Sequence, residues 1–97
     1  TKSATMVPYF VMETAFNSME VMLEMAKTGL PASISDAGVG AMCARTAIRG
    51  AGLNVRINVL DLDAADFVDK VLADSNLLLE KAEKLENEIL ELVDKQL

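Results

Sequence analysis

The run from residue 35 to residue 58 constrains the fold more than any other part of the chain. It has the residue pattern of one long helix, yet it contains four glycines: Gly38, Gly40, Gly50 and Gly52. Each glycine in a helix interior costs about 1 kcal/mol relative to alanine. Glycine is kept at such a cost where another backbone or a ligand must come very close. The run therefore predicts a helix in close contact with a neighbour.

A helical wheel divides this run into two opposite stripes and an apolar remainder. One stripe consists of small residues and two amides, namely Gly40, Ala44, Ala47, Ala51, Asn54 and Asn58. Three arginines, Arg45, Arg49 and Arg56, fall on nearly the opposite side. Because the remainder is apolar almost all round, we expect a central, buried helix. On this interpretation Asn54 and Asn58 are buried amides that need hydrogen-bond partners.

Apolar residues at helical spacing predict two further helices, so we expect an all-α, up-and-down helical bundle with three helices in this chain. The helices are expected at about 5–28, 35–60 and 63–95. Gly29 and Pro31 end the first helix, and Asp63 is the expected N-cap of the third, with Asp66 in a capping-box-like position. Three residues are possible N-caps of the second helix: Ser33, Ser35 and Asp36.

The first and third helices each present one main apolar face, and the second helix needs cover on nearly all sides. The seam of the third helix consists of Phe67, Val71, Leu78, Ala82, Leu85, Ile89 and Leu92. Two neighbours cannot surround the second helix. We therefore expect oligomerisation, or a missing part of the same domain, to complete the bundle.

Composition excludes several classes of function. The formal net charge is −6, and a nucleic-acid partner is not expected because phosphate contacts need a basic face. The chain has no histidine, the commonest zinc ligand, and we expect no metal site. The single cysteine, Cys43, is expected to be a small buried side chain rather than a nucleophile. Charges interrupt the apolar stretches, so we expect no membrane span and a cytoplasmic protein.

The sequence resembles the cyclodeaminase domain of formiminotransferase-cyclodeaminase and the related methenyltetrahydrofolate cyclohydrolases. The resemblance is carried by Ser35-Asp36, Gly38-Val39, Ala41, Ala44-Arg45, Gly50-Ala51, Leu53-Asn54-Val55 and Ile57-Asn58, with Ala4-Thr5-Met6-Val7-Pro8 upstream. It implies an enzyme of folate one-carbon metabolism built as a dimeric bundle of long helices. Family domains are about twice as long, so residues 1–97 resemble the C-terminal half of such a domain, with the family's catalytic aspartate in the other half.

The resemblance implies a tetrahydrofolate derivative as substrate and no covalently bound cofactor. The implied reaction is ring closure of formimidoyltetrahydrofolate with ammonia release, or, as an alternative, the cyclohydrolase reaction. The catalytic residues remain unknown, and Asp36 is the one acid inside the matched motif. Its alternative role is as a helix cap or dipole partner. A second alternative function is a non-catalytic helical assembly module, in which the small residues serve packing alone.

Four residues are candidates for substrate binding: Asp36, Asn54, Asn58 and Arg45. The two amides suit the amide-like edge of a pterin, and their alternative role is hydrogen bonding between helices. Arg45, together with Arg49 and Arg56, suits the carboxylates of the folate glutamate, which a guanidinium binds in bidentate fashion. The alternative for these arginines is a solvated face or a salt bridge between subunits.

Overall fold

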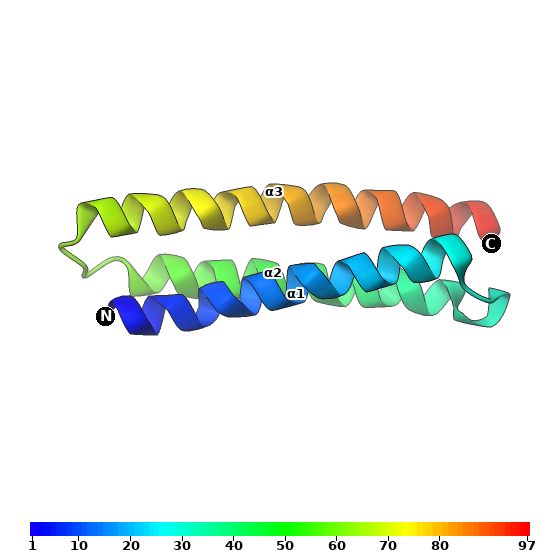
Figure 1. Ribbon diagram of the computed structural model, residues 1–97, viewed down its shortest axis with the longest axis horizontal. Coiled ribbons are helices and arrows are strands. Elements are labelled where there is room, and N and C mark those ends of the chain that lie inside the picture. Colours follow the sequence, from blue (N-terminus) through cyan, green and yellow to red (C-terminus); the bar gives the residue numbers. More distant parts are fainter.

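The computed structural model describes residues 1–97 as three long helices in a rod of 51 × 17 × 15 Å. Helix α1 covers Lys2–Thr28, α2 covers Ile34–Asn58 and α3 covers Ala65–Gln96, with a single 3-10 turn, η1 (Pro31–Ser33), between α1 and α2. The helices run up, down and up, so the two termini lie at opposite ends of the rod (Figure 1). The predicted all-α bundle is confirmed. None of the helices combines the length and apolarity that spanning a bilayer requires.

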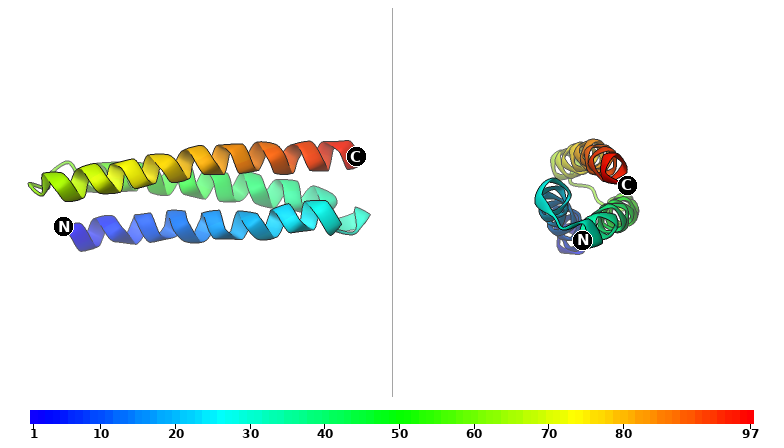
Figure 2. Two further views of the ribbon diagram at one scale, coloured as in Figure 1. Left: turned by 45° about the horizontal axis from the view of Figure 1, so that its top comes forward. Right: turned by 90° about the vertical axis from the view of Figure 1, so that its right-hand side faces the viewer.

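One core runs the length of the rod between the three helices, which stand at the corners of a triangle in the end-on view (Figure 2). Helix α1 buries every seventh residue: Thr5, Met12, Met19 and Ala26. Spacing by seven keeps one face of α1 toward both neighbours, the antiparallel α2 and the parallel α3. On α3, Val71, Ala82 and Ile89 of the expected seam are buried. The other four expected residues, Phe67, Leu78, Leu85 and Leu92, are half-buried against the core.

Helix α2 is buried on the sides facing α1 and α3 and exposed on its third side. Its buried residues are mostly small: Ile34, Ala37, Gly38, Ala41, Ala44, Ile48, Ala51, Gly52 and Val55. On the outer side Leu53 is 53% exposed and Ile57 is 61% exposed. Only two helices of this chain pack against α2, so its third side is left uncovered, as the sequence pattern indicates. Cover of that side by another subunit or by a missing part of the domain stays a prediction.

The helix ends correct several expectations. Helix α1 begins at Lys2 rather than near residue 5, because the Thr1 hydroxyl accepts a hydrogen bond of 3.1 Å from the Ala4 N–H. Ala64, not Asp63, holds the N-cap position of α3, and no side chain caps that helix. Ser33 holds the N-cap position of α2 without capping it. Its hydroxyl instead donates to the carbonyl of residue 30 at 3.0 Å.

Candidate functional site

Two hollows flank α2 near its C-terminal end. The first, which we call the amide groove, lies between α1 and α2, has a volume of about 460 Å³ and is lined by Ala4, Val7, Pro8, Val11, Ala47, Ala51, Asn54 and Asn58. The second, the arginine hollow, lies between α2 and α3, has a volume of about 390 Å³ and is lined by Leu53, Arg56, Ile57, Val59, Leu60 and Leu72. Apolar side chains predominate in both hollows, and each contains few polar groups, as small-molecule sites do.

The polar groups of the amide groove are the side chains of Asn54 and Asn58. One turn of α2 separates them, and the Nδ2 of Asn58 donates a hydrogen bond of 2.7 Å to the backbone carbonyl of Asn54. Asn54 is exposed and Asn58 is half-buried, so the expectation of two buried amides is wrong. They are exposed because no further helix covers this side of α2. The side-chain amide of Asn54 therefore presents both donors and an acceptor at the groove.

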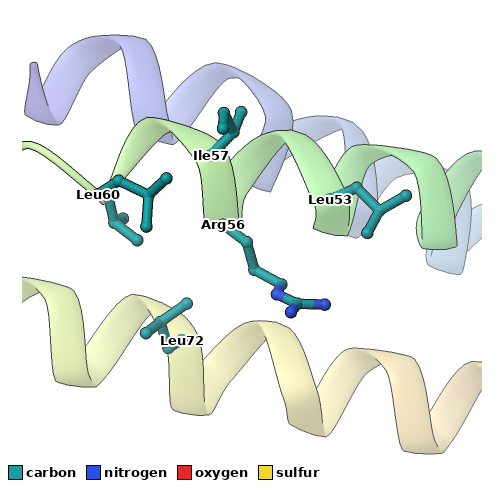
Figure 3. A pocket seen from close by; sticks show the side chains of 6 residues that line it. Leu53, Arg56, Ile57, Leu60 and Leu72 are labelled. Carbon is teal, nitrogen blue, oxygen red and sulfur yellow. The ribbon is translucent and has the colours of Figure 1, made fainter.

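The arginine hollow combines one cation with an apolar lining. Arg56 extends from α2 toward α3, with Leu53 and Leu60 on either side of it, and Leu72 projects from α3 (Figure 3). Arg56 is the one charged residue in the lining. It forms none of the ion pairs of the chain. The hollow thus presents a guanidinium group that has no ion-pair partner, next to apolar side chains.

Arg45 lies between α2 and α3 and is engaged by two acids of α3. Its Nη2 is 3.7 Å from Glu83 and its Nε is 3.6 Å from Glu86. The Nε is buried and makes no hydrogen bond of good geometry. The structure therefore gives Arg45 a salt bridge within the chain, whereas the sequence suggested a substrate carboxylate, a solvated face or a contact between subunits.

Asp36 lies in the first turn of α2 and is exposed. Eighteen residues separate it from Asn54, which is about 27 Å along a helix. The chain therefore does not bring Asp36 together with the two amides. Its position suits a favourable interaction with the positive end of the helix dipole.

The outer side of α2 also holds Cys43 and Gly50. Cys43 is exposed, so its expected burial is wrong within this chain, again because no third neighbour covers α2. A Cβ atom added to Gly50 would have no atom within 4 Å, whereas one on Gly52 would meet Met12 at 3.5 Å. A methyl group at residue 52 would thus make ordinary van der Waals contact with α1, and the packing of this chain gives no reason for glycine at residue 50. No group of three or more Cys, Asp or Glu side chains is placed to hold a metal ion.

The sequence pattern does not reveal which residues of α1 and α3 line the hollows. Val7, Pro8 and Val11 line the amide groove, and Leu72 lines the arginine hollow. These assignments depend on the register between antiparallel helices, which the pattern of one helix does not contain. The resemblance of residues 4–8 to the family is the one feature of the sequence that pointed to this part of α1.

The fold and its two hollows define an all-α helical bundle that presents amides and an arginine beside apolar surface at one end. A family model described as formiminotransferase-cyclodeaminase matches residues 1–77. The chain is also 35% identical over 92 residues to formimidoyltransferase-cyclodeaminase of Dictyostelium discoideum, an alignment that covers 95% of this chain and 17% of that protein. The chain therefore belongs to the formiminotransferase-cyclodeaminase family, and it spans about a sixth of the length of this relative.

Proposed function

We propose that this chain supplies part of the folate-binding surface of a cyclodeaminase domain, which closes the ring of formimidoyltetrahydrofolate and releases ammonia. The observation that carries the proposal is the position of the family match. Residues 1–77 include every residue that lines the amide groove and the arginine hollow. The similarity therefore extends over the surface itself as well as over the helices that support it.

The proposed reaction requires proton transfer at two points. N10 of the folate attacks the formimidoyl carbon, and the tetrahedral intermediate then loses ammonia. A base must take the proton from the attacking nitrogen and an acid must give one to the departing ammonia, tasks that carboxyl groups can perform. Neither hollow is lined by a carboxylate. The role proposed for these residues is accordingly to bind and orient the folate.

The amide groove is the proposed site of the pterin ring. A pterin edge carries adjacent hydrogen-bond donors and acceptors, which the amide of Asn54 can match. The Oδ1 of Asn58 adds a further acceptor, because its Nδ2 is already bonded to the Asn54 carbonyl. Pro8 and Val11 give the ring an apolar surface on the opposite wall.

Two other functions remain as alternatives. The cyclohydrolase reaction acts on the same one-carbon bridge with similar groups, so the same surface would serve it. A non-catalytic assembly module is favoured by a different observation, the exposed apolar side chains on adjoining faces of α1 and α2. These are Val7, Phe10, Val11, Val39, Met42, Leu53, Ile57 and Leu60. Exposed apolar patches of this kind commonly mark protein interfaces.

Calorimetric titration with tetrahydrofolate, together with assay of ammonia release from formimidoyltetrahydrofolate, tests the proposal on the polypeptide as its gene encodes it. We expect saturable binding that Asn54→Leu weakens by about tenfold, the loss that one or two good hydrogen bonds represent. Asn76→Leu, an exposed amide on α3, is the matched control. Ammonia release identifies the cyclodeaminase, and hydrolysis of methenyltetrahydrofolate without it identifies the cyclohydrolase. Absence of folate binding would leave the assembly module.

A further inference from the structure

A second stripe of residues at heptad spacing runs along the exposed side of α2. Its members, which we call the outer seam, lie alternately four and three residues apart: Met42, Thr46, Arg49, Leu53, Arg56 and, just beyond the end of the helix, Leu60. All six residues are exposed, and the three apolar ones, Met42, Leu53 and Leu60, are 44%, 53% and 72% exposed. Such spacing is typical of the seam along which one helix packs against another.

The two arginines of the outer seam have no acidic partner in this chain. Helix α3 presents Glu83 and Glu86 to Arg45, at 3.7 Å and 3.6 Å, but Arg49 and Arg56 take part in none of the ion pairs of the chain. Seven residues separate Arg49 from Arg56, which is two turns or about 10.5 Å along the helix. The outer seam therefore presents two unpaired cations, two turns apart, among apolar side chains.

Two hollows adjoin along the outer seam and share Leu53. The arginine hollow holds Arg56 with Leu53 and Leu60 on either side of it (Figure 3). The other has a volume of about 340 Å³ and is lined by Arg45, Thr46, Arg49, Gly50 and Leu53. A Cβ atom on Gly50 would have nothing within 4 Å. A helix packed along the outer seam would give Gly50 the close neighbour that this chain does not provide, and its side chains would fill both hollows.

We infer that the outer seam docks an amphipathic helix of a partner, which sets apolar side chains against the leucines and two carboxylates, seven residues apart, against Arg49 and Arg56. Apolar grooves bind amphipathic helices through side chains at this spacing. The charges select the occupant, because a neutral or basic helix would leave both guanidinium groups unpaired in an interface that excludes water. The inference goes beyond the proposed function: it assigns the arginine hollow to a protein contact and leaves the amide groove, between α1 and α2, to the folate.

A designed helical peptide of about four heptads is the probe. It carries leucine at its seam positions, glutamate at two of them seven residues apart, and outward lysines that bring its net charge to zero. A control peptide of the same composition has the two glutamates moved to its outward face, so the net charge of −6 on the chain acts equally on both. Fluorescence anisotropy of labelled peptide, titrated with the chain, measures the affinity. We expect the probe to bind about tenfold more tightly than the control, the effect of a charge-assisted hydrogen bond.

Charge reversal tests the two arginines directly. The double variant Arg49→Glu with Arg56→Glu should prefer a peptide that carries lysine in place of the two seam glutamates. The matched control is Lys81→Glu with Lys84→Glu, which changes the net charge equally at two exposed lysines of α3 that form no ion pair. This control should keep the parent's preference for glutamate. Helical circular dichroism verifies that each variant folds.

Each outcome decides for or against the inference. Equal affinity for the probe and the control peptide overturns it, as does an unchanged preference in the folded arginine double variant. A second copy of the chain is the competing occupant. Sedimentation that shows a one-to-one complex with the probe supports the inference, whereas chains that stay associated with one another at saturating probe assign the outer seam to a second copy and overturn it. Folate titration is a separate measurement without peptide, so the proposed function can fail while this inference stands, and the reverse.

Discussion

The Sδ atom of Met22 lies 3.2 Å from the position that a Cβ atom on Gly40 would occupy, and its Cε lies 3.1 Å from it. A methyl group at residue 40 would therefore crowd the end of the Met22 side chain of α1. Gly50, ten residues further along α2, has nothing within 4 Å of such a Cβ. Substituting Gly50 therefore measures the intrinsic cost of glycine in a helix, and substituting Gly40 measures that cost together with the effect of packing against Met22.

Gly50→Ala is expected to raise the free energy of unfolding of the isolated chain by about 1 kcal/mol, the difference in helix propensity. Gly40→Ala should gain less, because Met22 must move by a few tenths of an ångström to admit the methyl group. Urea denaturation of both variants measures the difference. Equal gains would contradict the packing role of Gly40.

Arg45→Gln is expected to lower the free energy of unfolding by about 1 kcal/mol, above the median for an exposed pair, because the side chains of Arg45 and Glu86 are 23% and 19% exposed. A double-mutant cycle of Arg45→Gln with Glu86→Gln, at low and high salt, isolates the coupling. Arg49→Gln, which breaks no ion pair, serves as the control. A coupling energy of zero would show that the pair contributes nothing to stability.

The stability of the fold is expected to fall above pH 10.0, the ordinary pKa of the tyrosine phenol. Burial raises the pKa of Tyr9 above that value, and the nearby charges of Glu13 and Asp74 raise it further. Because the folded phenol holds its proton more tightly than the unfolded one, its contribution is complete below pH 10.0 and is lost as the pH rises through the folded pKa.

Tyrosinate absorbance reports this titration directly, since Tyr9 is the one tyrosine of the chain. The folded chain should titrate at higher pH than the chain in urea. In the Tyr9→Phe variant the free energy of unfolding should fall less steeply as the pH rises above 10.0. Lys70 contributes to the remaining loss of stability. Its hydrogen bond to Asp74 raises its pKa in the folded chain, so its contribution to stability is also lost as the pH rises. Coincident titration curves in the two states would refute the prediction.

We predict that the chain is not a monomer in solution, because the third side of α2 exposes apolar side chains to water. Leu53→Glu should shift sedimentation toward the monomer. Leu77→Glu provides a matched control on α3, since Leu77 is 50% exposed and Leu53 is 53% exposed. A stable, folded monomer in the parent chain would argue against this prediction, as would an equal effect of the two substitutions.

Periodicity predicted the helices well because each apolar stripe is a local property of the sequence. The seam that includes Val71, Ala82 and Ile89 is buried as the spacing indicates. The N-cap of α3 was not predicted correctly. Aspartate is a preferred N-cap residue, but Ala64 rather than Asp63 holds the N-cap position of α3. The backbone path that connects two packed helices decides which residue begins the helix, and it outweighs the local preference.

The surroundings of individual side chains were less predictable. A wheel places Asn54 and Ala51 on one stripe, yet Ala51 is buried and Asn54 is exposed, because the stripe is wider than the contact with α1. The pairing of Arg45 with Glu86 depends on the register of two antiparallel helices. No pattern within either helix contains that register, so the sequence left the role of Arg45 open.

The odd number of helices decides where a reporter group can be attached. Thr1 stands at the end of the rod where α2 finishes, and Ala4, three residues on, already lines the amide groove. Leu97 stands at the far end of a molecule 51 Å long. A dye or affinity tag attached at residue 97 stays far from both hollows, whereas the same group at residue 1 lies beside the amide groove and would compete with whatever occupies it.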